Sequence, residues 1–343
     1  MRNQPSMNAL AEIPSAPSKT SPMSDPSRPV RSASAVDLEP IHRLEAAISR
    51  VVHGKADVVR LATISLLAGG HVLIEDVPGV GKTTLAQSLA KALGLSFQRI
   101  QFTSDLLPSD IIGVSIYRQQ QGEFEFVPGP LFANVVLADE INRATPKTQS
   151  ALLEAMSERR VSVERQRYVL PEPFLVLATQ NPLEYLGTFP LPESQLDRFL
   201  MSLSMGYPPR EDEKRLLLSG GVEDLMANVP PTLDREQLMA LQAGARQVKV
   251  SEKLADYMID LAEATRTDKD FGLGVSTRGV QGLFRATQAM AFCQGRDYAV
   301  PDDVQQLAVP VLAHRVTLRR GGGHLEEQRA AVRRLVGAVP VPL

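Results

Sequence analysis

The clearest chemical signal in the sequence is a short glycine-rich segment that ends in lysine and threonines. It follows an apolar stretch at residues 71–75 and precedes a predicted amphipathic helix that ends near Leu93. Glycines let backbone N–H groups converge on phosphate oxygens, the amino end of the helix adds positive potential, and lysine adds a mobile charge. The segment therefore predicts a phosphate-binding loop made of Asp76, Val77, Pro78, Gly79, Val80, Gly81, Lys82, Thr83 and Thr84.

Individual residues of this loop have predicted roles. Lys82 is expected to reach the β- and γ-phosphates of a nucleotide, and Thr83 to bind Mg²⁺. Asp76 stands where the general pattern G-x-x-x-x-G-K-S/T has glycine. Because aspartate tolerates left-handed backbone better than most residues, we expect the loop to form, and the effect of Asp76 on nucleotide affinity stays open. A glycine-rich turn that merely joins a strand to a helix is the simpler alternative.

A second signal is a pair of carboxylates at the end of a buried strand. Residues 135–139 form an apolar stretch that ends in Asp139 and is followed by Glu140. Ligands bind at the carboxyl ends of strands in open α/β sheets, so Asp139 is expected to hold Mg²⁺ and Glu140 to polarise the attacking water. A strand followed by Asp-Glu is common, but its position after Lys82, with one strand between, favours an ATP site.

Three further polar residues fit such a site less specifically. Asn181 follows the next buried stretch and could orient the attacking water, or it could start a turn before proline. Arg198 could reach the phosphate of a neighbouring subunit, or it could pair with Asp197 or Glu193. Arg278 opens a predicted helix and could close the second half of the chain onto the nucleotide, or it could be a solvated arginine at a helix start.

The elements that must position these residues follow an alternating pattern. Short apolar stretches alternate with helical segments, and they span residues 71–75, 97–102, 135–139 and 174–179. This alternation predicts an α/β fold, a parallel sheet covered by helices on both faces. Two hairpins are predicted to interrupt it, from Ser115 to Val127 and from Val161 to Leu170.

Composition and prolines divide the chain into three parts. Residues 1–37 are rich in proline and serine and poor in large apolar residues, so we expect a disordered tail. Residues 38–207 would form the core with the sheet. Prolines 208 and 209 disfavour helix at the boundary, and residues 208–343 are predicted to form a wholly helical domain with apolar stripes such as that of Leu254, Tyr257 and Leu261.

Bulk composition excludes several classes of protein. The 343 residues are 43% hydrophobic, enough for one large or two ordinary domains. Lysine and arginine number 37 against 39 acidic residues, so no overall basic charge draws the protein to nucleic acid. A single cysteine, Cys293, and histidines without metal-ligand spacing fit a reduced, cytoplasmic compartment. We expect no membrane span and no secretory signal.

Several segments together resemble the MoxR family of AAA+ ATPases, and the resemblance extends from about Leu38 to Arg320. The most specific segments are residues 99–103, 108–110, 129–134, 138–144, 147–156, 178–182 and 196–199. The resemblance implies an αβα AAA+ core followed by an all-helical lid. By the same resemblance, the two predicted hairpins are the helix-2 insertion and the hairpin before sensor 1.

The resemblance also implies roles and partners. Asn181 would be sensor 1, Arg198 an arginine finger acting on the next subunit, and Arg278 the sensor 2 of the lid. The family implies ATP and Mg²⁺ as ligands and homo-oligomeric rings, often hexamers. It also implies a chaperone-like role that remodels, matures or inserts cofactors into client proteins, commonly with a partner that carries a von Willebrand factor A domain. Change at the position of Asp76 is tolerated in this group.

Three functions follow as hypotheses. The first is a Mg²⁺-dependent ATPase in which hydrolysis moves the lid against the core. The second is a nucleotide-gated binding platform whose slow hydrolysis only resets it. The third and least favoured is a DNA motor, because the arginines near the second hairpin are accompanied by acids and no aromatic series suggests base stacking; these residues are Arg159, Arg160, Arg165 and Arg167 with Glu158, Glu164 and Glu172.

Overall fold

The computed structural model describes residues 38–120, 122–164, 166–181, 187–218, 222–320 and 325–342. The tail predicted at residues 1–37 lies outside the described residues. Within the described residues, no helix combines the length and the apolar character that crossing a membrane requires.

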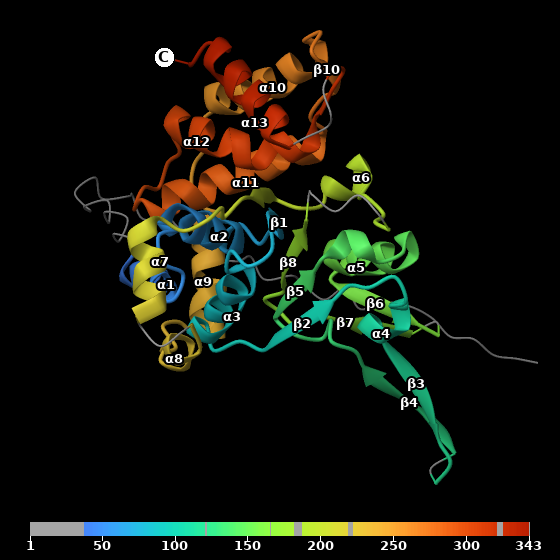
Figure 1. Cartoon of the computed structure of the whole chain (residues 1–343). Coiled ribbons are helices and arrows are strands. Elements are labelled where there is room, and N and C mark those ends of the chain that lie inside the picture. The colour runs from blue at the N-terminus through green and yellow to red at the C-terminus, as the bar shows by residue number, and fades with distance from the viewer. Residues whose placement is uncertain are drawn as a thin grey trace, which may run out of the picture. The chain divides into compact units, whose positions relative to one another are not determined.

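A five-stranded parallel sheet forms the centre of the first half of the chain (Figure 1). The strand order is β2-β5-β8-β1-β9, and every neighbouring pair is parallel. The strands are β1 Val72–Glu75, β2 Phe97–Gln101, β5 Val135–Asp139, β8 Leu175–Gln180 and β9 Met201–Leu203. The first four confirm the predicted strands with small shifts at their ends. Strand β9 was not predicted, because three residues are too few to show a pattern.

Helices cover both faces of this sheet. Residues of α1, α2 and α3 belong to one apolar cluster and residues of α4 and α5 to another. Val72 and Ile74 of β1 lie in the first cluster and Leu73 in the second, because successive side chains of a strand point to opposite faces. These helices are α1 Glu39–Ser49, α2 Ala56–Leu67, α3 Lys82–Ala92, α4 Pro108–Ile112 and α5 Pro146–Glu158. The predicted α/β fold is therefore confirmed.

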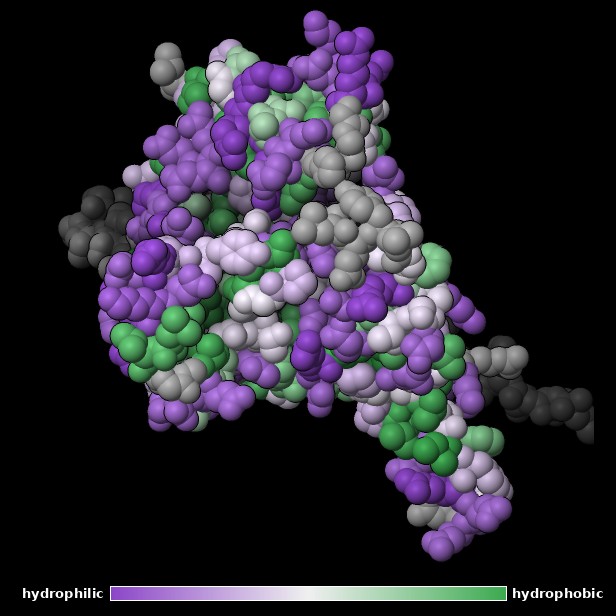
Figure 2. Space-filling view, in the orientation of Figure 1, coloured by the Kyte–Doolittle hydropathy of each residue, from purple (hydrophilic) through white to green (hydrophobic). Residues whose placement is uncertain are grey.

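Both predicted hairpins are present. Their strands are β3 Gly113–Arg118 with β4 Glu123–Pro128, and β6 Arg160–Val163 with β7 Gln166–Val169. The rings of Phe126 and Tyr168 stack with centroids 3.9 Å apart and so join the two hairpins. The β3–β4 hairpin extends away from the sheet in Figure 1, and hydrophobic side chains gather over it in Figure 2. Val114, Ile116, Tyr117 and Phe124 are its large exposed apolar residues among those described.

The second half of the chain is helical. After the short helices η1 Ile141–Arg143 and α6 Glu193–Leu196 of the first half, the helices are α7 Arg210–Leu218, α8 Val222–Ala227, α9 Arg235–Ala245, α10 Glu252–Thr267, α11 Thr277–Cys293, α12 Pro301–Leu312, η2 Ala313–Arg315 and α13 Leu325–Ala338. We call residues from α10 onward the lid. The apolar cluster of α1–α3 continues into α11 and α12.

The prediction of a wholly helical second half was wrong at one place. Strand β10 Phe271–Leu273 pairs antiparallel with β11 Thr317–Leu318. The pairing buries Phe271, but both strands are too short to show an alternating pattern. Contacts also cross the predicted boundary, since the Thr232 N–H donates to the Ala92 carbonyl at 2.7 Å. The division between residues 207 and 208 stays a prediction.

Candidate active site

The glycine-rich loop joins the carboxyl end of β1 to α3. Gly79 has φ of +82° and Gly81 a φ of +94°, a region that residues with a Cβ rarely adopt. No side chain caps the amino end of α3, whose N-cap is Gly81. The first-turn N–H groups of a helix have no partner within the helix, so this end of α3 suits an anion such as phosphate.

A cavity of about 440 Å³ opens over the loop, within the range of about 300–1,000 Å³ for small-molecule pockets. Its walls come from the loop, from β2 and β5, and from the chain around α1, α7 and α8; they are Val51, Val52, His53, Lys55, Pro78, Gly79, Val80, Gly81, Lys82, Thr83, Thr84, Arg99, Asp139, Glu140, Pro208, Leu216 and Val222. Five of the predicted site residues are not among these walls, namely Asp76, Val77, Asn181, Arg198 and Arg278.

Lys82 lies against the backbone of its own loop. Its Nζ donates to the carbonyl oxygens of Asp76 at 2.9 Å and of Val77 at 3.2 Å. These contacts keep the ammonium group at the wall of the cavity, from which it can turn to phosphate oxygens.

The carboxylate of Asp139 is held on both sides at the floor of the cavity. Its Oδ2 accepts hydrogen bonds from Arg99 Nη2 at 2.6 Å and Nε at 3.1 Å. Its Oδ1 accepts one from Thr179 Oγ1 at 2.6 Å. Arg99 comes from β2 and Thr179 from β8, the two neighbours of β5 in the sheet. The orientation of Asp139 is therefore fixed by both neighbouring strands.

Glu140 follows β5 in left-handed backbone with φ of 56°. This unusual conformation for a residue with a Cβ is supported by a hydrogen bond from its N–H to Thr179 Oγ1 at 2.8 Å. The Glu140 carboxylate accepts hydrogen bonds from Gln101 Nε2 at 2.6 Å and Arg143 Nη1 at 2.9 Å. Both acids thus line one cavity with the phosphate-binding loop, as the sequence predicted.

Asn181 lies at the same edge of the sheet. It directly follows β8, which pairs with β5 on one side and β1 on the other. Asn181 and Glu140 therefore follow two strands that lie side by side in the sheet. The Asp76 N–H donates to the carbonyl oxygen of Gln180 at 3.2 Å, so Asn181 follows a residue that is bonded to the start of the loop. Asn181 is buried.

Asp76 faces away from the cavity and fastens the loop to the chain after β9. Its Oδ2 accepts hydrogen bonds from the N–H groups of Met205 and Gly206, both at 2.6 Å, and from Ser204 Oγ at 3.0 Å. Its Oδ1 accepts one from the Val77 N–H at 2.8 Å. Burial alone would raise the pKa of Asp76, but these hydrogen bonds together hold the pKa below its usual value. Its φ is not positive, so left-handed tolerance is not why aspartate is accepted here.

Four functional residues were missed by reasoning from the sequence. Arg99, Gln101, Arg143 and Thr179 hold the carboxylates of Asp139 and Glu140. A usable signal existed in β2, where two polar side chains two residues apart must share one face of the strand. Nothing in the sequence pairs that face with β5 until the sheet order is known.

Arg198 lies at the opposite edge of the sheet. The Leu200 N–H donates to the His71 carbonyl at 2.7 Å, at the amino end of β1, whereas the loop follows the carboxyl end. Arg198 Nη1 donates to the Leu153 carbonyl at 2.8 Å and to Ser157 Oγ. Its Nε is buried without a hydrogen-bond partner among the described residues. The alternative pairing with Asp197 is not formed, since the ion-pair partners of Asp197 come from the lid.

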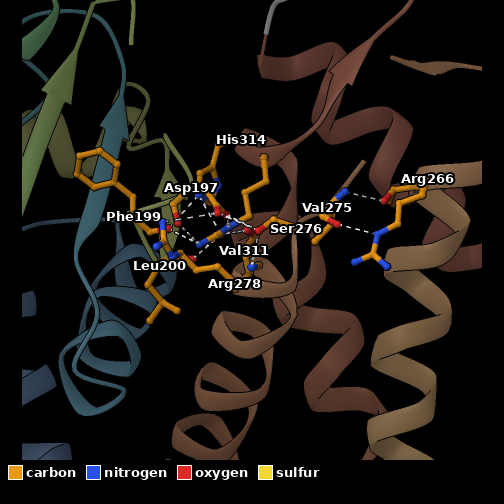
Figure 3. A network of polar contacts seen from close by, with 12 residues as sticks. Asp197, Phe199, Leu200, Arg266, Val275, Ser276, Arg278, Val311 and His314 are labelled. Atoms are coloured by element: carbon orange, nitrogen blue, oxygen red, sulfur yellow. Dashed lines mark hydrogen bonds and ion pairs between the residues drawn. The ribbon is translucent and has the colours of Figure 1, made fainter. Parts of the chain in front are cut away.

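Arg278 lies near Asp197, the residue before Arg198, and is not among the walls of the cavity. It is in the first turn of α11, and its Nη1 is 3.9 Å from Asp197 Oδ2 (Figure 3). Its side chain is 55% exposed. The structure therefore does not bring Arg278 to the loop of its own chain, the first of the two possibilities that the sequence left open, and Arg278 is an exposed arginine at a helix start, as in the second. The packing of the lid decides which edge a helix start meets, and the sequence does not contain that information locally.

The residues in the cavity fit Mg²⁺. Within the described residues, no cluster of three or more His, Cys, Asp or Glu could hold a metal ion. Mg²⁺ needs no such cluster, because it keeps several waters and binds phosphate oxygens with one or two carboxylates. The Thr83 hydroxyl and the Asp139 carboxylate lie in the wall of one cavity and supply the oxygen ligands that Mg²⁺ prefers.

The sheet order, the loop and the acidic strand end together define a P-loop ATPase fold of the AAA+ class with a helical lid. The model of the ATPase family associated with various cellular activities (AAA) matches residues 71–201, and that of an AAA lid domain matches residues 263–335.

Individual proteins extend this similarity over most of the chain. Chaperone MoxR1 of Mycobacterium tuberculosis is 43% identical over 81% of this chain and 76% of its own length. Uncharacterized protein YeaC of Bacillus subtilis is 48% identical over 86% of this chain and 93% of its own. The crystal structure of a presumed ATPase from Cytophaga hutchinsonii covers 89% of this chain and 96% of its own, with a TM-score of 0.81 and 37% identity. The chain belongs to the MoxR family of AAA+ ATPases.

Proposed function

We propose that this protein hydrolyses Mg-ATP in a ring of identical subunits. One observation carries the proposal: the groups that the chemistry needs are divided between two edges of one sheet. The loop, Asp139 and Glu140 lie at the carboxyl edge, while Arg198 and Arg278 lie at the amino edge. Since neither arginine can reach the phosphates of its own chain, each acts on those of a neighbour, and a closed ring gives every cavity a neighbour.

Within the cavity the chain binds the phosphates and Mg²⁺, and it orients and polarises the attacking water. The N–H groups of the loop and Lys82 hold the phosphates, and the Thr83 hydroxyl and Asp139 hold Mg²⁺. When bound, Mg²⁺ neutralises charge on the β- and γ-phosphate oxygens. Glu140 accepts a hydrogen bond from the attacking water and turns it toward the γ-phosphate. To do so its carboxylate exchanges contacts with Gln101 and Arg143 for a contact with water, and Asn181 helps to orient that water.

The two arginines supply charge stabilisation from outside the chain. Arg198 and Arg278 from one subunit contact the γ-phosphate of the next, where developing negative charge needs compensation. This assignment differs from a lid that closes on its own nucleotide. It is supported by the 3.9 Å contact of Arg278 with Asp197, the residue next to Arg198.

The work done with ATP is chaperone-like. Similarity to Chaperone MoxR1 over most of the chain supports this. The exposed apolar side chains of the β3–β4 hairpin, among them Tyr117 and Phe124, offer a surface for a client protein. In this proposal the protein acts in the cytoplasm, where it remodels or matures a client protein or inserts a cofactor into it. It works there with a partner that carries a von Willebrand factor A domain.

Replacing Glu140 with glutamine tests the catalytic role. The Glu140→Gln variant should bind ATP normally and form rings, while phosphate release should fall by about 100-fold or more, since general-base catalysis contributes roughly 10²–10⁴. Glu236→Gln, an exposed residue of α9, is the matched control. Undiminished phosphate release by Glu140→Gln would remove Glu140 from the mechanism.

A slow nucleotide-gated platform is the second candidate, and one observation favours it. Both acids of the cavity are already engaged, Asp139 by Arg99 and Glu140 by Arg143. An ATPase whose acids must first be released turns over slowly until a partner intervenes. Turnover near the uncatalysed rate, even with a partner protein present, would favour this candidate over the motor.

A further inference from the structure

Arg315 of the lid holds the backbone on both sides of Arg198. Its Nε donates to Asp197 Oδ1 at 2.9 Å, Nη1 to the Leu200 carbonyl at 3.1 Å, and Nη2 to the carbonyl of Asp197 at 3.3 Å and to that of Phe199. The side chain of Arg315 is 3% exposed. A single lid residue therefore fixes the positions directly before and after the finger.

Asp197 connects the same segment to the start of α11. Ser276 Oγ donates to Asp197 Oδ2 at 2.8 Å, and it also accepts the Gly279 N–H at 3.0 Å as the N-cap of that helix. A carboxylate at a helix N-terminus is favoured by the helix dipole. Arg278 lies in this first turn, so the Asp197 carboxylate links Arg278 to the residue that directly precedes Arg198 (Figure 3).

Two glycines of α11 make room for Arg315. A Cβ at Gly279 would lie 2.8 Å from Arg315 Cδ, and a Cβ at Gly282 would lie 3.5 Å from Arg315 Nη2. Glycine inside a helix is unfavourable by about 1 kcal/mol relative to alanine. The space that these glycines leave is shared by Arg315 with Val275 and Leu200.

The charge of this contact is maintained in the folded protein. Burial lowers the pKa of Arg315 to about 10, while Asp197 acts to raise it, so the guanidinium stays protonated at neutral pH. His314 beside it is held neutral, because burial and the Arg315 charge keep the His314 pKa well below its usual value. Buried Arg315 and partly exposed Asp197 therefore form an ion pair, of a kind that is poor evidence for stability but can specify geometry.

We propose that Arg315 and Asp197 are positioning residues that present Arg198 and Arg278 to the neighbouring subunit as one unit. The proposal rests on the proposed function, since it needs both arginines to act on the next subunit. Neither Arg315 nor Asp197 touches the nucleotide; they act through the finger. A shift of the finger by about 1 Å can cost roughly 100-fold in rate, so loss of the contact lowers kcat and leaves KM for ATP within about twofold.

A mixing experiment separates positioning from general stability. One subunit, Lys82→Ala, cannot hold phosphate but supplies intact arginines. The other, Arg198→Ala, has an intact cavity but no finger. Neither should hydrolyse ATP alone, and mixed rings should recover activity at the cavities of the second subunit. No recovery on mixing would count against the proposed function itself.

Arg315→Lys is then added to one subunit at a time. Placed on the subunit that supplies the arginines, it should lower the recovered kcat by about 10- to 100-fold. Placed on the subunit that supplies the cavity, it should change kcat less than twofold. If the mixed rings recover activity but Arg315→Lys lowers kcat equally in both placements, the positioning role is overturned while the proposed function stays intact.

Two measurements keep the test decisive if Arg315→Lys folds poorly. Ring size by light scattering and melting temperature are recorded for each variant. Ser276→Ala removes only the hydroxyl that bonds Asp197 and the Gly279 N–H, and it should give a smaller loss with the same dependence on placement. A loss that ignores placement in this variant also contradicts the proposal.

Discussion

Replacing Asp76 with asparagine isolates the contact between the phosphate-binding loop and the chain after β9. Asp76 is 8% exposed, and its Oδ2 accepts hydrogen bonds from two backbone N–H groups, both at 2.6 Å. Asparagine can offer only one oxygen. It must turn its NH₂ either toward Met205 and Gly206 or toward Val77, so a donor meets a donor in both orientations.

The expected cost follows from these contacts. Hydrogen bonds to charged groups contribute about 1.5–3 kcal/mol each and are not additive, so we expect Asp76→Asn to lower the free energy of unfolding by about 3 kcal/mol. At about 2–4 °C per kcal/mol, the melting temperature should fall by about 6 to 12 °C. Asp76→Gly restores the general loop pattern but removes all four acceptor contacts, and it should destabilise at least as much.

Thermal unfolding monitored by circular dichroism measures the effect, with Asp256→Asn on the exposed side of α10 as the control. The pH dependence has a defined sign. Because hydrogen bonds hold the folded pKa of Asp76 below its ordinary value of 3.8, its contribution is present above pH 3.8 and is lost as pH falls through the folded pKa. The difference in melting temperature between wild type and Asp76→Asn should therefore become smaller only in strong acid.

Two results would refute this reasoning. One is an Asp76→Asn variant that melts with the Asp256→Asn control. The other is an Asp76→Gly variant that binds ATP more tightly than wild type at full stability, which would mean that aspartate is a defect of the loop rather than its anchor.

Three further predictions concern single groups. Gly81→Ala should weaken ATP binding by about tenfold or more, because a non-glycine residue at φ of +94° costs about 1–3 kcal/mol. Titration with a fluorescent ATP analogue measures the affinity. The control Gly337→Ala, at a helix position with no neighbour near the added Cβ, should bind ATP normally. Burial lowers the pKa of His71 to about 4, so the free energy of unfolding should fall by about 3 kcal/mol as the pH is lowered from 6.5 to 4. Denaturant titrations measure this fall, which should be shallower for His71→Asn. Burial raises the pKa of Cys293 to about 12, so iodoacetamide at pH 8 should label this thiol only after unfolding; rapid labelling of native protein would contradict its packing.

The parts of the fold that neighbouring residues determine could be predicted from the sequence. The loop from Gly79 to Thr83 needs a strand before it, a helix after it and glycines at left-handed positions, and all three are local properties. Asp139 was predictable because a fully apolar strand that ends in acids must place them at the carboxyl edge of a parallel sheet.

Reasoning from the sequence could not predict contacts that depend on how distant segments pack. Arg99 reaches Asp139 only because β2 lies beside β5, and the sequence does not state the strand order. Arg278 could be assigned to either edge of the sheet until the lid was placed. Arg315 carried no signal at all, since an arginine followed by Val316 and Thr317 gives no indication that it will be buried among backbone carbonyls.

The apolar cluster that runs from α1–α3 into α11 and α12 has a mechanical consequence. Swinging the lid on its own core would expose that cluster to water, at about 25 cal/mol for each Å² of apolar surface, and would also break the ion pair of Arg315 with Asp197. Lid and core are therefore better described as one lever. In the proposed ring, lid and core of one chain would therefore move together, and the angle between neighbouring subunits would change rather than a hinge within one chain.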